Sequence, residues 1–450
     1  MRMVKYLIAF PIELLGIIIV TTTVFYRRYL RGGNAPPKKP RLVWGPTPLL
    51  NYKYFANALK QKGYLAKTLV DPPYHISEKG DFDVYIERLL PEFRGFWFFK
   101  AVRDRLLLYL SFAYAVRHFD IFHHNCHGGF LGRSIFWKWE AWLLRKAGCK
   151  VVIGTYGADI QRYSRIVDPC FRHVLQTDYP NNARREPEIA RRVEYWVRNA
   201  DVFFSGSSID GIGRWDYIVP STLCIDLSLW SRKRAYSKND GFNGPVKVIH
   251  TPNHRGIKGT EFIIEAVNEL RSDGLDIQLI LLEKKKNTEV CRLMQEEADI
   301  LAEQLLATAY GLSAIEGMAS GIPVLANLES GPTTRIFRRY SFLNECPILS
   351  TTPETVKDNL LILANNPDLR EELGRAGREY VEKYHSYETA QFVFEAFYDR
   401  IWYGKEVDAM NLFHPLKSEY VKSKPLVKHP LVENKLAEPY RRTAQSNSRN

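Results

Sequence analysis

The sequence predicts an α/β protein with two Rossmann-like domains facing a cleft, an apolar N-terminal helix and a mobile C-terminal tail. Three observations lead to this fold class. Short apolar runs alternate with helix-length segments, which is typical of βαβ units and a parallel sheet. The alternation stops at a polar, turn-rich stretch near 231–245 and then begins again. Finally, 450 residues are more than one compact core usually holds.

The order along the chain gives four parts. Residues 1–40 are predicted to form a membrane anchor helix and a linker, 41–235 and 236–404 two Rossmann-like domains, and 405–450 a disordered tail. The linker contains the stretch GGNAPPKKP, which has little that could pack. The tail is predicted because the chain after Gly404 loses its periodicity and collects Lys and Pro.

The N-terminal helix is predicted from residues 6–26, which read YLIAFPIELLGIIIVTTTVFY and are interrupted by Pro11 and Glu13. The run just reaches the length that spans a bilayer. More basic residues follow it than precede it, so the positive-inside tendency places the long C-terminal part on the cytoplasmic side. Because Glu13 would be costly at mid-bilayer, an interfacial helix is the alternative to a single-pass anchor.

The strands and helices of the two domains are predicted from short apolar runs and from helical periodicity. In the first domain, strands are predicted at 41–44, 65–70, 119–123, 150–155 and 201–205, and a helix at 52–64. In the second domain, strands are predicted at 246–250, 277–283, 322–327 and from 299 onward, and helices at 258–270, 310–320 and within 353–403. The carboxyl ends of parallel strands are where ligands bind in such sheets, so the loops after the strands are the candidate sites.

The charge of the chain bears on its partners. Lysine and arginine total 63 against 50 aspartate and glutamate, a net charge of +13. This excess indicates an anionic partner, such as a phosphorylated substrate or an acidic membrane face, or simply a basic surface. A nucleic-acid partner is not predicted, because the basic residues are dispersed and no interleaved aromatic motif accompanies them. The six cysteines are scattered without a CxxC pair, which disfavours a zinc site or a disulfide scaffold.

The most informative segment is YGLSAIEGMASGIPVLANLE, residues 310–329. Gly311 permits a tight entry into a helix whose first turn has free backbone N–H groups, and that end can hold an anion such as a diphosphate. Glu316 lies in the same helix, where its carboxylate can accept hydrogen bonds from a sugar or ribose. The alternative is an ordinary helix–strand unit with small packing residues.

A second candidate segment is HTPNHRGIKGTEFIIEAV, which begins at His250. Arg255 and Lys258 follow a predicted strand and lie in a glycine-containing loop that ends at a helix start. Two cations there could pair with a diphosphate and stabilise a leaving group. From the residues alone, a basic surface turn is the alternative.

These two segments resemble the donor site of retaining GT-B glycosyltransferases of glycosyltransferase family 4 (glycosyl transferases group 1), of the bacterial polysaccharide type. The family signature is a glutamate, a Gly-aromatic-Gly-Leu stretch, a second glutamate and then Ala-Met-Ala-x-Gly-x-Pro-Val. The residues that match it are Tyr310, Gly311, Leu312, Glu316, Met318, Ala319, Gly321, Pro323 and Val324. The first glutamate of the family corresponds to Thr308 here, which departs from the pattern. Glu303, five residues earlier, resembles the acid of an acid-Gln pair that some bacterial relatives carry at this point.

The resemblance implies an enzyme that moves a sugar from a nucleotide-sugar to a hydroxyl of a glycan or lipid-linked acceptor, with retention of anomeric configuration. Residues 236–404 would be the donor domain and 41–235 the acceptor domain, onto which a final helix near Tyr387–Tyr403 would cross back. The residues implied to contact the donor are Arg255, Lys258, Gly311, Leu312, Glu316, Glu303 and Gly45. No metal or other cofactor is expected, because fixed cations and a helix N-terminus offset the charge of the leaving group.

The acceptor side rests on weaker signals. Three histidines, at positions 123, 124 and 127, cluster in FDIFHHNCHGGFLG at a predicted strand end. In the resembled family a histidine of this loop faces the sugar, so the implied catalytic residues are His127, then His123 (with His124 close behind), together with Glu316. A metal site is disfavoured because no acidic partner accompanies the histidines. The alternative to a role in the site is that the histidine rings form hydrogen bonds with the nearby backbone. Asp159, in a Gly-x-Asp segment, would orient an acceptor hydroxyl or cap the following turn.

A second function class stays open beside the enzyme. A GT-B-like scaffold that binds a glycan or a nucleotide without catalysis would keep the same segments, and Thr308 in place of the family glutamate is its best support. Binding without turnover would distinguish the scaffold from the enzyme.

Overall fold

The computed structural model describes residues 2–30, 38–72, 78, 80–92, 97–157, 159–206, 210–217, 223–340, 342–437 and 440. The chain divides into two compact units. Unit 1 comprises Met1–Gln161, Pro187–Ile218 and Ala390–Ala409, and unit 2 comprises Arg162–Glu186, Val219–Thr389 and Met410–Asn450. Each unit is built around its own parallel sheet with helices packed on it, as the alternation of strands and helices in the sequence predicts.

Unit 1 contains a six-stranded parallel sheet in the order β3-β2-β1-β4-β5-β6. This is the doubly wound order of a Rossmann sheet, with the strand order reversing between β1 and β4. The strands are β1 (Leu42–Trp44), β2 (Ala66–Val70), β3 (Val84–Tyr85), β4 (Ile121–His124), β5 (Lys150–Gly154) and β6 (Val202–Phe204). The five strands predicted here start within two residues of the observed ones. The two-residue β3 was not predicted, because it is too short to show a period.

The helices of unit 1 cover this sheet. They are α1 (Arg2–Phe25), α2 (Leu50–Gln61), α3 (Trp97–His118), α4 (Glu140–Lys146), α7 (Glu186–Asn199) and α15 (Tyr387–Ile401). Most of α15 belongs to unit 1 although unit 2 precedes it in the sequence. Within unit 1, the Gln391 side-chain amide donates to the Ala58 carbonyl of α2 at 2.8 Å. The helix therefore packs on α2, far from it in sequence.

Unit 2 contains a five-stranded parallel sheet in the order β11-β10-β9-β7-β8. Its strands are β7 (Val246–His250), β8 (Ile277–Leu281), β9 (Ile300–Gln304), β10 (Val324–Ala326) and β11 (Leu349–Ser350). Its helices are α5 (Pro169–Asp178), α6 (Pro180–Arg184), α8 (Arg255–Lys258), α9 (Thr260–Ser272), α10 (Asn287–Glu296), α11 (Leu312–Ala319), α12 (Gly331–Arg339), α13 (Val356–Asn365) and α14 (Pro367–Tyr384). In this sheet the strand order reverses between β7 and β9, which places their carboxyl ends side by side at the ligand-binding edge.

The segment after Gly404 corrects the prediction of a disordered tail. Unit 2 includes α16 (Glu419–Ser423) and a hairpin of β12 (Leu431–Val432) and β13 (Lys435–Leu436). The two leucines of the hairpin are buried in the hydrophobic core of the second sheet. The strands are too short for the hairpin to be predicted from a sequence period, because each spans two residues. The turn between them uses two left-handed residues, Glu433 and Asn434. Residues 438, 439 and 441–450 lie outside the described part.

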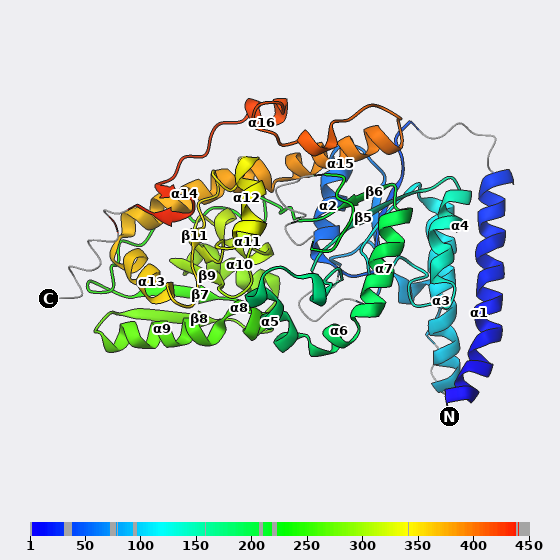
Figure 1. The fold of residues 1–450 in the computed structure, drawn as a ribbon, viewed down its shortest axis with the longest axis horizontal. Helices are drawn as coiled ribbons and strands as arrows, with labels where there is room; N and C mark the ends of the chain where they lie inside the picture. Colours follow the sequence, from blue (N-terminus) through cyan, green and yellow to red (C-terminus); the bar gives the residue numbers. More distant parts are fainter. Residues whose placement is uncertain are drawn as a thin grey trace. The chain divides into compact units, whose positions relative to one another are not determined.

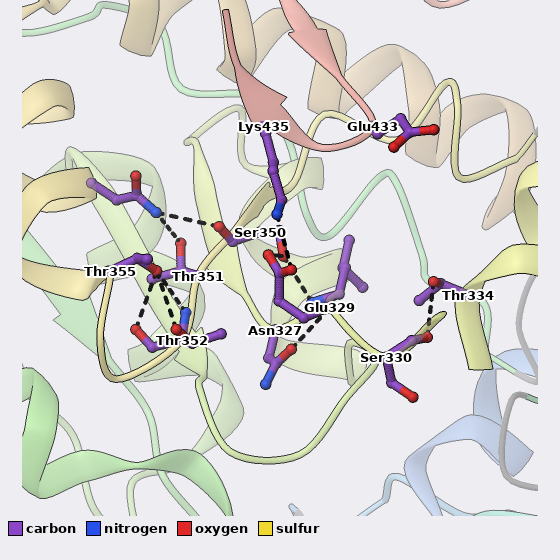
Figure 2. A network of polar contacts seen from close by, with 12 residues as sticks. Asn327, Glu329, Ser330, Thr334, Ser350, Thr351, Thr352, Thr355, Glu433 and Lys435 are labelled. Atoms are coloured by element: carbon purple, nitrogen blue, oxygen red, sulfur yellow. Dashed lines mark hydrogen bonds and ion pairs between the residues drawn. The ribbon is translucent and has the colours of Figure 1, made fainter. Parts of the chain in front are cut away.

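Polar contacts also hold the hairpin on unit 2, as Figure 2 shows. The Lys435 ammonium forms an ion pair with Glu329 at 3.0 Å, and the other oxygen of Glu329 accepts from the Ser350 hydroxyl at 3.0 Å. The backbone N–H of Ser350 donates to the Asn434 carbonyl at 2.8 Å. These bonds join the hairpin to the ends of β10 and β11.

Within the described residues, one helix is long and apolar enough to cross a membrane, at Phe10–Tyr29. It overlaps the predicted anchor, and its residues pack against α3 of the same unit. Residues 31–37 of the predicted linker lie outside the described part of the chain.

Candidate functional site

A buried ion pair joins the carboxyl ends of β7 and β9 in unit 2. Lys258, the last residue of α8, is paired through its ammonium with Oε1 of Glu303 on β9. The same ammonium donates to the side-chain oxygen of Gln304 at 3.1 Å, and the Ser313 hydroxyl donates to Glu303 Oε1 at 2.9 Å. The sequence implied Lys258 and Glu303 as donor contacts, and the structure brings them together at the sheet edge where such folds bind ligands.

Gly311 lets helix α11 begin close to this ion pair. It is the residue that precedes the helix, with extended backbone, and its missing side chain matters because of its neighbours. A Cβ atom there would lie 3.2 Å from Glu303 Oε1 and 3.7 Å from Lys258 Nζ. Leu312 then forms the first turn of α11, whose N–H groups lack partners within the helix. The predicted helix entry therefore lies beside the predicted cation.

Glu316 is buried in α11 and faces α10. Its Oε1 accepts a hydrogen bond from the Asn287 amide at 3.0 Å. Burial raises the pKa of Glu316 to about 8, an effect that the Glu303 carboxylate reinforces and that Asn287 and Lys258 oppose. At neutral pH this carboxyl is therefore largely protonated and can donate a hydrogen bond to a ligand hydroxyl as well as accept one. Asn287 was missed at the sequence level, because nothing local marks an amide 29 residues from its partner.

The second oxygen of Glu303 gives this cluster an open polar position. Glu303 Oε2 is buried and has no hydrogen-bond partner among the residues that the structure describes. Buried carboxylate oxygens normally have a partner, and a hydroxyl or amide of a bound molecule would satisfy this one. Glu303 thus places a carboxylate near the start of α11. In the pattern of the resembled family the corresponding glutamate would stand at the position of Thr308.

Arg255 has ion-pair partners different from that of Lys258. It is exposed at the start of α8, and its guanidinium bonds Glu261 at 2.8 Å and Glu283 at 3.0 Å. Both carboxylates are themselves exposed, so water screens these pairs. The side chain is therefore free to exchange them for a more highly charged ligand such as a diphosphate.

Helix α5 supports the loop that carries these cations. The Asp178 carboxylate accepts from the backbone N–H of Ile257 at 2.7 Å, and a side chain at Gly256 would overlap that carboxylate. The rings of Tyr179 and His254 pack at 4.7 Å. Sequence reasoning missed Asp178, because it lies 79 residues before its partner and in the stretch predicted to belong to the other domain.

In unit 1, the predicted loop after β1 is held by the neighbouring strands. The backbone N–H of Gly45 donates to the His123 carbonyl at 3.1 Å. A side chain at Gly45 would overlap the carbonyl of Leu69 on β2. The lack of a side chain at Gly45 therefore has a packing reason within unit 1, whatever further role the resemblance implies.

The three loop histidines lie in different surroundings. His123 is buried, stacked on Trp44 at 4.1 Å, with one ring nitrogen bonded to the Val43 carbonyl and the other to the Tyr398 hydroxyl. Burial lowers the pKa of His123 to about 3 and that of His124 to about 4, so both rings are neutral. His127 is exposed, and its ring packs edge-on against Tyr156 at 6.0 Å. Of the three, His127 is the one that a ligand in solvent can reach.

Asp159 joins the two loops that follow β4 and β5. Its carboxylate accepts from the backbone N–H groups of Cys126 at 3.0 Å, Tyr156 at 3.2 Å and Gly157 at 3.1 Å. Burial raises the pKa of Asp159 to about 6, and these three hydrogen bonds oppose the shift. Within the described part of the chain, the carboxylate therefore bonds to residues that precede it and not to the turn that follows, and it holds the loop that carries His127.

No family model matches the chain. A segment of 104 residues, 23% of the chain, is 31% identical to an uncharacterized glycosyltransferase of Methanocaldococcus jannaschii. The chain resembles glycosyltransferases. This match spans 28% of the length of the relative.

Solved structures similar to the chain have low identity to it. A glycosyltransferase from Rickettsia africae is 13% identical, with a TM-score of 0.43 over 80% of this chain and 98% of that one. HepE from Anabaena, in complex with UDP and glucose, is 13% identical, with a TM-score of 0.44 over 79% and 98%. The catalytic domain of starch synthase IV from Arabidopsis thaliana, bound to ADP and acarbose, is 12% identical, with a TM-score of 0.45 over 81% and 99%.

Proposed function

We propose that the protein is a retaining glycosyltransferase that moves a sugar from a nucleotide-sugar to a hydroxyl of a glycan or lipid-linked acceptor. One observation carries this proposal. Lys258, Glu303, Glu316 and the start of α11 at Gly311 gather at one edge of the second sheet. A cation, a helix N-terminus and two carboxyl groups are the groups that a diphosphate and a sugar require.

The donor would bind with its diphosphate at the start of α11. The N–H groups of that first turn and the cations of Arg255 and Lys258 would neutralise the phosphates, which eases departure of the nucleotide as the glycosidic bond breaks. Glu303 already holds Lys258 in place, so the ammonium is oriented before the donor arrives. Fixed cations would replace a metal ion in this scheme.

The two carboxyl groups would bind the sugar and the ribose. Glu316, protonated at neutral pH, would donate to one hydroxyl, and Glu303 Oε2 would accept from another. The acceptor hydroxyl would attack on the face that the nucleotide leaves, with the departing phosphate taking its proton, so that no covalent intermediate with the protein forms. His127 would contact the sugar or the acceptor.

A second candidate function, a scaffold that binds a nucleotide or glycan without catalysis, has its own support. Thr308 stands where the family has an acid, and the Lys258 ammonium is already paired with Glu303. A site with an internally compensated cation can bind a ligand without strongly stabilising a leaving group.

Donor binding is the experiment that tests the site. Thermal stability of the full chain would be followed against UDP-, GDP-, ADP- and CMP-sugars, for the wild type and for Arg255→Ala, Glu316→Gln and the control Arg292→Ala. Arg292 is an exposed arginine on α10 that is ion-paired with Glu296. Ligand at 100 times its Kd adds about 2.7 kcal/mol to stability.

We expect one nucleotide class to stabilise the wild type and Arg292→Ala, and to lose most of its effect in Arg255→Ala. The absence of any shift in the folded protein would contradict the donor site. Free nucleotide would then be measured over time with the stabilising donor. If the wild type releases free nucleotide from the donor, and Glu316→Gln slows this release at least tenfold, the enzyme is supported. If the donor binds and no free nucleotide is released, the scaffold is favoured.

A further inference from the structure

Helix α1 has two opposite faces, one built for protein contacts and one apolar and exposed. The inward face carries Glu13, Gly16, Ile17, Val20 and Val24, which are buried against unit 1. The outward face carries Phe10, Leu14, Leu15, Ile18 and Phe25, and continues as Tyr26 and Tyr29 in the short π-helix Tyr26–Leu30, all exposed. Most of these positions recur at helical spacing, so they form a stripe along one side of the helix.

The inward face fixes α1 lengthwise on unit 1. At the middle of the helix, the Glu13 carboxylate pairs with Arg105 at 3.0 Å and accepts from the Tyr109 hydroxyl, both on α3. Near its end, Arg27 pairs with Asp120 at 2.7 Å and also donates to backbone carbonyls at the end of α3. Figure 1 shows α1 running beside α3. A helix held at its middle and at its end cannot leave the unit to cross a bilayer without exposing these charges to hydrocarbon.

A second apolar element adjoins α1. The backbone N–H of Ile135 lies 3.4 Å from Glu13 Oε2, and the Ala147 carbonyl accepts from Arg27, so the chain from 135 to 147 runs along the helix. In this segment Ile135, Trp139 and Trp142 are exposed. Tryptophan is enriched where proteins meet the headgroup region of a membrane, because its ring is apolar and its N–H is polar.

Within these two segments the exposed charges are basic. Over residues 10–29 and 133–146, the exposed charged side chains are Arg28, Arg133, Lys138, Arg145 and Lys146. Arg133 is ion-paired with Asp71 at 2.7 Å, which leaves the other four as the cations of this face. The carboxylates in these two segments, Glu13 and Glu140, are buried. Basic residues that flank an apolar stripe are attracted to anionic lipid headgroups.

Two of the three threonine hydroxyls of α1 are bonded within the helix. Those of Thr21 and Thr23 donate to backbone carbonyls one turn earlier, at 2.9 Å and 2.8 Å. A hydroxyl bonded in this way leaves no donor that would need water. The stripe is roughly 30 Å long at 1.5 Å per residue, enough for a helix lying in the interface.

We propose that unit 1 docks on an anionic lipid bilayer with α1 lying in the plane of the interface. Its outer stripe, with Trp139 and Trp142 beside it, enters the headgroup region, and the flanking cations meet the lipid phosphates. Glu13 stays inside the protein, bonded to Arg105, and does not enter the bilayer. The proposal is independent of the transferase activity, since it concerns binding to lipid alone.

Flotation of the full chain with lipid vesicles tests this surface. Vesicles of phosphatidylcholine, alone or with 30% phosphatidylglycerol, would be compared for the wild type, Leu14→Glu/Ile18→Glu and Trp139→Glu/Trp142→Glu. The matched controls are Leu416→Glu and Phe242→Glu, exposed apolar positions of unit 2. We expect tight binding to the anionic vesicles, at least tenfold weaker binding in both double variants, and unchanged binding in the controls.

Three results would overturn the proposal. Equal losses in the controls, or unchanged binding in the double variants, would show that the stripe is not the docking surface. A wild type that forms a dimer without lipid, and that Leu14→Glu/Ile18→Glu converts to a monomer with no change in vesicle binding, would assign the face to a second copy. Melting temperatures of all variants serve as the check on folding.

The orientation of α1 needs a separate readout. Membranes from cells that express the full chain would be washed with alkaline carbonate, which removes interfacial proteins and leaves spanning helices in place. We expect the wash to release the wild type. Retention in the membrane would contradict the in-plane arrangement and support a single-pass anchor.

Discussion

Two histidines that are close in the sequence, His123 and His127, differ in burial and should therefore differ in their contribution to stability. His123 is stacked on Trp44 with both ring nitrogens bonded, whereas His127 is exposed. His123→Ala would leave a cavity and an unpaired Tyr398 hydroxyl, so we expect a loss of about 2–4 kcal/mol in the free energy of unfolding. His127→Ala is expected to change it by about 0.5 kcal/mol or less.

Urea denaturation of the two variants measures both values. If His127 contacts the sugar or the acceptor, His127→Ala should lower turnover while the melting temperature stays near that of the wild type. A loss of stability in His127→Ala as large as that in His123→Ala would contradict the difference in burial.

Glu316 should make stability depend on pH. Burial raises its pKa from 4.5 to about 8, so between these values the folded chain holds a proton that the unfolded chain has released. The stabilisation that this bound proton gives to the folded chain is therefore fully present below about pH 4.5, and it is lost as the pH rises towards 8. Glu316→Gln should remove it, which reduces the fall in stability between pH 5 and pH 8 by about 1–3 kcal/mol.

The measurement is urea denaturation at several pH values. Glu296→Gln, an exposed position on α10, is the control and should keep the slope of the wild type. An unchanged slope in Glu316→Gln would show that the carboxyl is ionised in the folded protein.

At the scale of elements, the packing of the C-terminal hairpin predicts that substitutions in it change stability, which substitutions in a disordered tail would not do. Leu431 is 6% exposed in the core of unit 2, and its neighbour Val432 is 68% exposed. Leu431→Ala should cost about 2–3 kcal/mol of unfolding free energy, because it leaves a cavity beneath the hairpin. Val432→Ala should cost about 0.5 kcal/mol or less.

Chemical denaturation distinguishes the two, and the adjacent valine controls for any general effect on the hairpin. Equal and small effects of both substitutions would mean that the hairpin does not pack on the sheet in solution.

At the scale of the whole molecule, the six cysteines lie in both units, so their accessibility to a reagent reports on the packing of each unit. All six are unpaired, five are buried and Cys170 is exposed. A thiol reagent should therefore modify one cysteine rapidly in the folded protein and all six in urea, and a reductant should leave the melting temperature unchanged.

Cys170→Ser is the control and should abolish the rapid reaction. Fewer than six thiols in urea without reductant would indicate a disulfide. More than one rapid thiol would show that one of the units opens readily.

The sequence by itself determined the strands, the two-sheet organisation and the segments that hold the candidate site. These are local properties: apolar runs mark the strands, and Gly311, Glu316, Arg255 and Lys258 lie in segments that resemble the donor site of a glycosyltransferase family. The end of the ordered chain was misjudged, because the two-residue strands of the final hairpin are stabilised by burial against unit 2 and not by any period of their own.

Tertiary structure alone decided how the chosen residues are paired. The bonds of Lys258 to Glu303, of Glu316 to Asn287 and of Asp178 to Ile257 join positions 29 to 79 residues apart, and no local pattern encodes such distances. Only folding buries Glu316 deeply enough to raise its pKa. The same holds for α1, whose sequence allowed a spanning or an interfacial helix. Its contacts with α3 favour the second, because they satisfy Glu13 and Arg27 inside the protein.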